Sequence, residues 1–273
     1  MPSVRFTKAV ASGNDFIILD NTGGVLGAAG INFAGFALKM CRRKVSIGAD
    51  GVLVLEDSPR GDLRMRIFNP DGSEVTMCGN GARCAAAYAR LKGRCQGDIR
   101  METGAGIVEA AMNGGLVRLK MTDPKDMKLD KNLGIDNHVL MAHYVNTGVP
   151  HVVFFVENIE EYPVRDIGSK IRYHSAFSPD GTNANFVKIT GPDTIRVRTY
   201  ERGVEDETLA CGTGSVASAI ISSVVHGLKS PVKALTSSGE TLNVYFEPRG
   251  GRVSNVCLEG RAEISYEGEV QYV

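Results

Sequence analysis

Hydrophobic positions along this chain alternate with polar ones in some stretches and form short unbroken runs in others. Residues 16–19 are all apolar, which is typical of a strand buried on both faces. Residues 63–69 alternate apolar with basic or polar side chains, which predicts a strand with one buried face. Two longer stretches, 78–91 and 211–225, combine small and apolar residues and predict buried helices. The pattern therefore predicts a strand-rich α/β (α+β) fold.

The other elements follow from the same runs and from turn residues. Residues 4–20 predict two strands separated by a turn at 11–14, and residues 23–30 predict a glycine-rich loop. A short helix is expected at 33–41, where three basic residues follow it. Further strands are expected at 52–56, 99–101, 107–112, 116–121, 152–156 and 265–273.

Segments of the first half of the chain recur in the second half in the same order. Residues 63–69 match residues 195–201, at an offset of 132, and Cys78 matches Cys211, at an offset of 133. Two further matches pair Gly13 with Gly148 and Gly115 with Gly251. We infer a duplicated domain, in which each copy is a strand-rich shell around one central helix.

The boundary between the two copies is expected at the polar, proline-containing residues 121–125. This predicts an N-terminal domain over 1–120 and a C-terminal domain over 121–264, with the last strand, 265–273, returning to the first domain. Because small ligands commonly bind between domains, the active-site cleft is expected between the two copies.

Composition excludes several classes of function. The 273 residues carry 31 Lys plus Arg and 31 Asp plus Glu, so no basic surface for nucleic acid or for a membrane is expected. Residues 1–10 lack the apolar core of a secretory signal, and no apolar run is long enough to cross a bilayer. The six cysteines follow neither disulfide-framework nor zinc spacing. We expect a reduced, cytoplasmic protein without a metal site, in which Cys41, Cys95 and Cys257 are packing residues.

Two four-residue motifs stand at the starts of the expected buried helices. They read Cys78-Gly79-Asn80-Gly81 and Cys211-Gly212-Thr213-Gly214, and an acidic, polar run precedes each. A cysteine at a helix N-terminus lies at the positive end of the helix dipole, which favours the thiolate. A lone cysteine in an apolar helix is more often a core residue. The repetition of the motif favours chemistry over packing.

Two cysteines that face each other across a small anionic substrate suit the inversion of a carbon centre. One thiolate removes a proton from one face and the other thiol returns a proton to the opposite face. The backbone N–H groups of Gly79, Asn80, Gly212 and Thr213 would stabilise the enolate-like charge that grows on a carboxylate. No pyridoxal phosphate site is evident, so a cofactor-free mechanism is expected.

Four segments of the sequence resemble segments of a known family. Residues 69–84, from Asn69-Pro70-Asp71-Gly72-Ser73 to Cys84, resemble the N-terminal signature of diaminopimelate epimerase, and residues 200–203 with 207–214 resemble its second signature. Residues 13–16 and 182–186 also match. The resemblance implies two similar α/β domains with a cleft between them, usually in a homodimer. It also implies conversion of LL- to meso-2,6-diaminopimelate, without a cofactor, in lysine and peptidoglycan precursor biosynthesis.

The resemblance also assigns roles to particular residues. Cys78 and Cys211 match the paired acid and base, with Cys211 as proton acceptor and Cys78 as donor in the LL-to-meso direction. Arg202 would bind the distal carboxylate, and Glu201 would bind the substrate amine. His151 and Glu201 would tune the pKa values of the cysteines. The matched substrate-binding asparagines are Asn14, Asn69 and Asn183.

The sequence also allows two rival functions. One is a two-cysteine racemase of the proline or hydroxyproline type, and the other is a non-catalytic amino-acid-binding protein of the same fold. Arg202 together with three asparagines favours a long substrate that is charged at both ends, and two intact cysteines favour an enzyme. Val149 and Gly51 stand where some family members carry Asn and Gln, which bears on fine substrate selectivity.

Overall fold

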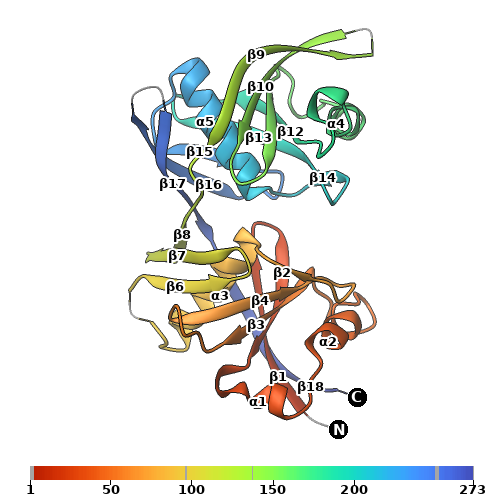
Figure 1. Ribbon diagram of the computed structural model, residues 1–273, viewed down its shortest axis with the longest axis vertical. Helices are drawn as coiled ribbons and strands as arrows, with labels where there is room; N and C mark the ends of the chain where they lie inside the picture. The colour runs from red at the N-terminus through yellow and green to blue at the C-terminus, as the bar shows by residue number, and fades with distance from the viewer. Residues whose placement is uncertain (1–2, 96, 137, 250–251, 273) are drawn as a thin grey trace. The chain divides into compact units, whose positions relative to one another are not determined.

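The computed structural model describes residues 3–95, 97–136, 138–249 and 252–272. Gly251 of the sequence repeat and Val273 of the expected last strand lie outside the described residues. The chain forms two compact units (Figure 1). Unit 1 comprises Met1–Leu119 and Gly260–Val273, and unit 2 comprises Lys120–Glu259.

Unit 1 is built on a curved, mixed sheet. Its strands follow the spatial order β18 (Glu263–Gln271), β1 (Ser3–Ala11), β2 (Asn14–Asp20), β3 (Gly51–Glu56), β4 (Leu63–Phe68), β6 (Ile99–Thr103), β7 (Gly106–Asn113) and β8 (Leu116–Lys120). The β2–β3 and β4–β6 pairs are parallel and the others antiparallel, while the short β5 (Glu74–Val75) pairs with β4. Helix α3 (Gly79–Leu91) contacts β1, β2, β3, β4, β7 and β18, so this sheet surrounds it.

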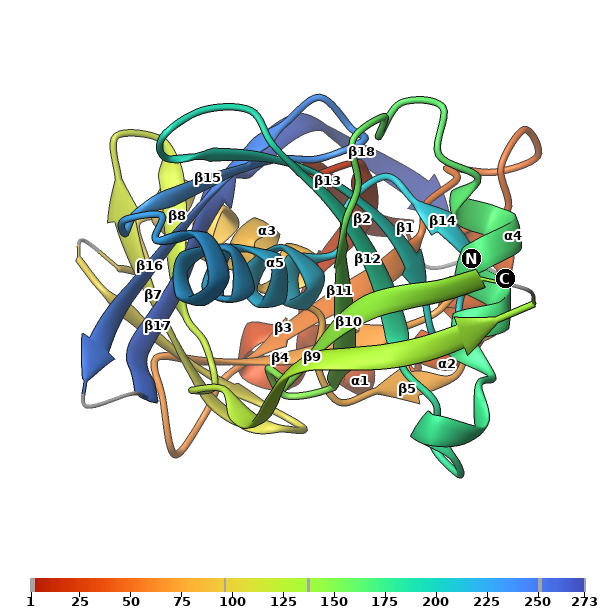
Figure 2. The same ribbon diagram turned by 90° about the horizontal axis from the view of Figure 1, so that it is seen from above.

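Unit 2 has a sheet of the same kind. The strand order is β9 (Lys125–Ile135), β10 (His138–Asn146), β11 (Pro150–Phe155), β12 (Asn183–Ile189), β13 (Thr194–Glu201), β15 (Val232–Leu235), β16 (Thr241–Arg249) and β17 (Arg252–Arg261). The β11–β12 and β13–β15 pairs are parallel, and the short β14 (Asp206–Thr208) pairs with β13. Figure 2 shows α5 (Gly212–His226) among strands of this sheet, and it contacts β10, β11, β12, β13, β15 and β16.

The two units repeat one topology element by element. Each has the pairing order antiparallel, parallel, antiparallel, parallel along its central strands, beginning at β1–β2 in unit 1 and at β10–β11 in unit 2. Helix α2 (Phe33–Met40) connects the first parallel pair in unit 1, and α4 (Val164–Arg172) connects it in unit 2. The predicted α/β fold and the predicted duplication are confirmed.

Apolar side chains fill the space between helix and sheet in each unit. In unit 1, Ile17 and Leu19 of β2 pack with Phe36 of α2. In unit 2, Val216 and Ile220 of α5 share one buried cluster with Val153 of β11 and Val187 of β12. Each such side chain stabilises the fold by about 1.5–3 kcal/mol when fully buried. The unit 2 core thus packs α5 against its sheet, and the unit 1 cluster packs α2 against its sheet.

The glycine-rich loop expected at 23–30 is partly helical, which corrects that prediction. It contains a 3₁₀ turn, Thr22–Gly24, and a single helical turn, α1 (Val25–Ala28). The side chain of Asn21 accepts hydrogen bonds from the N–H groups of Leu26 and Gly27, at 2.9 and 3.2 Å, and so caps this turn. Asn21 lies outside residues 23–30, so the glycine pattern of that run did not indicate the cap.

Hydropathy and length do not mark a single membrane span among the described helices. Only the bent pair Thr22–Ala28 and Phe33–Met40 reaches the length and composition of a span when taken together. Phe36, Ala37 and Met40 of this pair are buried in the core of unit 1.

Candidate active site

Cys78 and Cys211 occupy the same structural position in their respective units. Each is the extended residue that precedes its helix, with φ and ψ of −146° and 119° at Cys78 and −118° and 114° at Cys211. The first helical bonds run from Ala82 N to Cys78 O, 2.8 Å, and from Ser215 N to Cys211 O, 2.9 Å. The N–H groups of the residues next to each cysteine therefore precede the helical hydrogen-bond ladder, and they point to an anion-binding site. These residues are Gly79, Asn80, Gly212 and Thr213.

The two sulfur atoms have different surroundings. Cys78 is half-buried, and its Sγ accepts a hydrogen bond from Gly81 N–H at 3.5 Å. Cys211 is buried, and its Sγ lies 3.6 Å from the Thr213 hydroxyl. Burial raises the pKa of the Cys211 thiol, the negative charge of Glu201 raises it further, and Thr213 and the Gly214 N–H oppose the shift. The N–H of Gly214 at the helix start thus favours the thiolate, but burial and Glu201 outweigh it and the net shift of the Cys211 pKa is upward.

Glu201 lies at the end of β13 and is coupled to the Cys211 thiol. Its carboxylate accepts a hydrogen bond from the Thr208 hydroxyl at 3.1 Å and another from Cys211. Burial raises the pKa of Glu201, and these two hydrogen bonds oppose the shift. The carboxylate is thus a proton acceptor within hydrogen-bond reach of the thiol.

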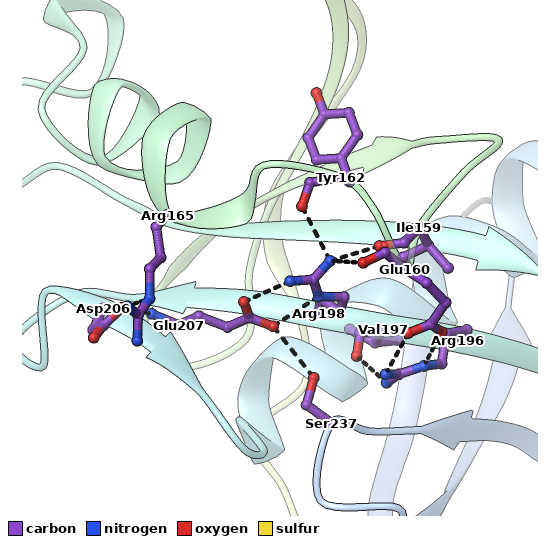
Figure 3. Close-up of polar contacts among 10 residues, drawn as sticks. All are labelled: Ile159, Glu160, Tyr162, Arg165, Arg196, Val197, Arg198, Asp206, Glu207 and Ser237. Atoms are coloured by element: carbon purple, nitrogen blue, oxygen red, sulfur yellow. Dashed lines mark hydrogen bonds and ion pairs between the residues drawn. The ribbon is translucent and has the colours of Figure 1, made fainter.

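An arginine–glutamate fork holds the strand that leads to each cysteine. In unit 2, Arg198 of β13 donates from Nε and Nη2 to the two carboxylate oxygens of Glu207 in β14, both at 2.7 Å. The Nη1 atom of Arg198 also donates to three backbone carbonyls of the 159–162 loop, at 2.7 to 3.0 Å (Figure 3). In unit 1, Arg66 makes the same two-pronged contact with Glu74, at 2.8 and 2.7 Å. Such paired contacts fix the direction of the hairpin before each cysteine.

A directed chain of hydrogen bonds positions Asn14 and Asn80 in unit 1. Arg83 Nη2 donates to Asn80 Oδ1 at 2.6 Å, Asn80 Nδ2 donates to Asn14 Oδ1 at 2.7 Å, and Asn14 Nδ2 donates to Asp50 Oδ2 at 3.0 Å. Arginine can only donate and an ionised aspartate can only accept. The two ends therefore fix the orientation of both amides. Arg83 is fully buried in α3 and also donates to the Ser12 hydroxyl and to the backbone carbonyl of Arg261.

The other predicted polar residues divide between the two units. In unit 1, Asn69 donates to the Ser73 hydroxyl at 3.0 Å. In unit 2, Asn183 donates to Pro150 O and accepts from Arg202 N–H, both at 2.8 Å. Arg202 Nη1 donates to a backbone carbonyl at 3.2 Å, and Arg202 takes part in none of the ion pairs found among the described residues. Its guanidinium is therefore available for a carboxylate.

His151 is fully buried in β11, where it lies opposite Asn183 in the parallel pair β11–β12. Asn185 Nδ2 lies 3.1 Å from His151 Nδ1 and 3.0 Å from Val152 O, and Asn185 Oδ1 accepts from the Thr199 hydroxyl at 3.0 Å. Burial lowers the pKa of His151 to about 3, and the charge of Arg202 adds to this shift. The histidine is therefore neutral at physiological pH.

The structure thus groups the predicted residues within each unit, with Asn14 hydrogen-bonded to Asn80 in unit 1 and Glu201 to Cys211 in unit 2. Sequence reasoning missed the side chains that support them: Asp50, Arg83, Asn185, Arg198 and Thr199. For two of these a signal was present. Arg83 is a charge inside a run of small residues, and Asn185 is a polar residue between the two apolar residues Ala184 and Phe186.

The family described as "Diaminopimelate epimerase" matches residues 6–125 and 143–273. The diaminopimelate epimerase of Aquifex aeolicus (strain VF5) is 41% identical over 277 residues, which cover 98% of each chain.

Two solved structures share the fold at low identity. A PhzF-family phenazine biosynthesis protein of Bacillus anthracis superposes with a TM-score of 0.73 at 18% identity and covers 100% of both chains. A probable proline racemase from Agrobacterium radiobacter K84 superposes with a TM-score of 0.68 at 16% identity and covers 99% of this chain and 93% of that one. The family match and the close relative, however, cover nearly the whole sequence, and this chain belongs to the diaminopimelate epimerase family.

Proposed function

We propose that this protein interconverts LL- and meso-2,6-diaminopimelate by moving a proton at one α-carbon, without a cofactor. The observation that carries the proposal is the repeated placement of one cysteine. Cys78 and Cys211 each follow a hairpin held by an arginine–glutamate fork, and each precedes a buried helix whose first N–H groups are outside the helical ladder. A mechanism with two opposed acid–base groups needs this kind of pair.

The chemistry requires both cysteines to reach one α-carbon from opposite faces. In the LL-to-meso direction, Cys211 acts as the base, so the Cα–H bond breaks and an S–H bond forms. Cys78 acts as the acid, and its thiol proton is transferred to the opposite face of the carbon. Because the pKa of Cys211 is raised in the ligand-free protein, the thiol must lose its proton before it can act. Glu201 is the acceptor for that proton.

Substrate recognition follows from the donors that the structure leaves available. Asn14 and Asn183 each use one amide N–H and the amide oxygen in contacts with the protein, and each amide nitrogen carries a second N–H. These donors suit carboxylate groups. Arg202 suits the distal carboxylate, and the N–H groups at the two helix starts suit the carboxylate on which negative charge develops. Glu201 keeps an acceptor oxygen after it takes the proton of Cys211, and this oxygen suits the α-ammonium group.

The family resemblance adds three further proposals. The enzyme is a homodimer, it acts in the cytoplasm, and it supplies meso-diaminopimelate for lysine and peptidoglycan precursors. Sedimentation equilibrium of the purified protein tests the oligomeric state, and a monomer across the working concentration range would contradict the first of these proposals.

The function is tested by incubation with LL-diaminopimelate in deuterated water. ¹H NMR should show loss of the α-proton signal, and chiral chromatography should show meso product that carries solvent deuterium. L-Proline and trans-4-hydroxy-L-proline, incubated in parallel, should show no exchange. Exchange of a proline α-proton without exchange in LL-diaminopimelate would favour the rival racemase function.

A further inference from the structure

Asn185 lies at the centre of the buried polar cluster in unit 2. It is 0% exposed and pairs with Thr199 across β12–β13. Its amide nitrogen donates to Val152 O at 3.0 Å and faces His151 Nδ1 at 3.1 Å, while its amide oxygen accepts from the Thr199 hydroxyl at 3.0 Å. The two N–H groups and the oxygen of this amide are therefore all engaged.

The partners of Asn185 allow only one orientation of its amide. Val152 O can only accept, so the amide nitrogen must face it, because the flipped amide would bring two carbonyl oxygens together. The second amide N–H then points to His151 Nδ1, which must accept. A neutral imidazole that accepts at Nδ1 carries its proton on Nε2.

This leaves His151 Nε2–H as a donor that the cluster itself does not use. Nε2 is buried and has no hydrogen-bond partner among the described residues. The cluster also abuts the start of α5: a side chain built on Gly214 would overlap Asn185 Oδ1 and would meet Cys211 Sγ at 3.2 Å. The cluster that carries this donor thus adjoins Cys211 through Asn185, while His151 lies opposite Asn183 and feels the charge of Arg202.

We propose that Asn185 is a positioning residue that holds His151 as a neutral imidazole, with Nε2–H presented as a hydrogen-bond donor to the substrate bound at Cys211. This inference rests on the proposed function for the identity of the substrate. His151 then does not act as a base toward the thiol, because its only lone pair is held by Asn185. It stabilises negative charge on a substrate carboxylate, and no proton is transferred.

The first test is the tautomer itself, which needs no activity. In protein labelled with ¹⁵N-histidine, two-bond ¹H–¹⁵N NMR spectra distinguish a protonated from an unprotonated ring nitrogen. The signal of His151, assigned by its absence in His151→Phe, should show a protonated Nε2 and an unprotonated Nδ1 from about pH 8 to about pH 5. A protonated Nδ1, a mixture of tautomers or an imidazolium in this range would overturn the proposal.

The second test removes the positioning contact. Asn185→Leu introduces the residue found at the equivalent position of unit 1, Leu53, and should abolish the single tautomer. It should also lower kcat/KM roughly tenfold, which is the scale of one buried hydrogen bond. Thr199→Val should have a smaller effect in the same direction. Ser218→Ala, which removes a buried hydroxyl from α5 outside this cluster, serves as the control and should leave the tautomer unchanged.

The third test separates this inference from the proposed function. Addition of LL-diaminopimelate to wild-type protein should shift the His151 Nε2–H resonance, whereas L-proline should not. If the enzyme epimerises LL-diaminopimelate but the resonance does not move, or if Asn185→Leu folds and keeps both the tautomer and full activity, this inference fails alone. If the tautomer is as stated but no epimerisation occurs, the proposed function fails and the assignment of the donor to this substrate fails with it.

Discussion

The two units of this chain share a topology but differ beneath the starts of their cysteine helices. In unit 1 a side chain built on Gly81 would meet Leu53 and Phe16, both apolar. In unit 2 a side chain built on Gly214 would meet the amide of Asn185. The strand registers make Asn185 the equivalent of Leu53, and likewise His151 of Phe16 and Thr199 of Ile67. The two units thus share a frame, but unit 1 has an apolar cluster where unit 2 has a polar one.

On the helices the difference is reversed: the polar residue belongs to unit 1 and the apolar residue to unit 2. The buried Arg83 of α3, which anchors the chain of amides to Asn14, has the buried Val216 as its counterpart in α5. In unit 1 the buried polar residue therefore lies on the helix, at Arg83, and in unit 2 it lies on the sheet, at Asn185. We infer that the repeated frame gives the two thiols the same geometry, while the exchanged networks give them different chemical surroundings. This fits two acid–base groups with unequal roles.

Removal of the arginine from each arginine–glutamate fork should give the largest difference in stability between the two units. The Arg198–Glu207 side chains are 16% and 18% exposed, whereas those of Arg66–Glu74 are 26% and 42% exposed. Arg198→Met leaves Glu207 and three carbonyls without their donor and should lower the free energy of unfolding by about 3 kcal/mol. Arg66→Met should lower it by about 1 kcal/mol or less, because solvent screens that pair. Urea denaturation of the two variants measures both values, and equal losses would contradict the comparison.

Alanine at the two equivalent glycines, Gly81 and Gly214, should have unequal effects. Gly214→Ala would push a methyl group into an amide held by its full set of hydrogen bonds, at an overpacking cost of about 2 kcal/mol, and should also impair turnover through Cys211. Gly81→Ala meets a flexible leucine methyl group at 3.0 Å and should cost less. Thermal unfolding and steady-state kinetics of both variants measure the difference. A more severe defect in Gly81→Ala would show that Asn185 is not rigidly held.

The buried histidine of unit 2 should give a pH dependence of stability that unit 1, with Phe16, does not have. The pKa of His151 is lowered to about 3, so between that value and the ordinary pKa of about 6.5 the unfolded chain binds a proton that the folded chain does not. The contribution of this residue to the free energy of unfolding is therefore lost as the pH falls below about 6.5, at up to about 1.4 kcal/mol per pH unit. Urea denaturation of His151→Phe over this range should give a shallower slope than wild type. Identical slopes would mean that His151 is not buried in its neutral form.

Features that depend on neighbours in sequence could be predicted from the sequence. The helix starts at Cys78 and Cys211 follow from the Gly-x-Gly motifs and the apolar residues that come next, and the repeat follows from order and spacing alone. The helical turn α1 was missed because a single capping residue, Asn21, decides it from outside the glycine-rich run.

Features that depend on distant partners could not be predicted. Arg83 is explained by Ser12 and by Arg261 O, which lie 71 and 178 residues away in sequence. The raised pKa of Cys211 depends on its burial and on Glu201, and neither can be read from the motif that contains the cysteine. A motif thus locates a reactive group, while its protonation state is set by residues that only folding brings near it.

The most direct test of the two-cysteine account is steady-state epimerisation by Cys78→Ala and Cys211→Ala, started separately from LL- and from meso-diaminopimelate. Because each direction of turnover uses one thiol as base and the other as acid, each variant should lose activity in both directions by roughly 10²–10⁴-fold. Circular dichroism of both variants controls for folding. Near-normal turnover by a folded variant, in either direction, would remove that cysteine from the chemistry and contradict the account.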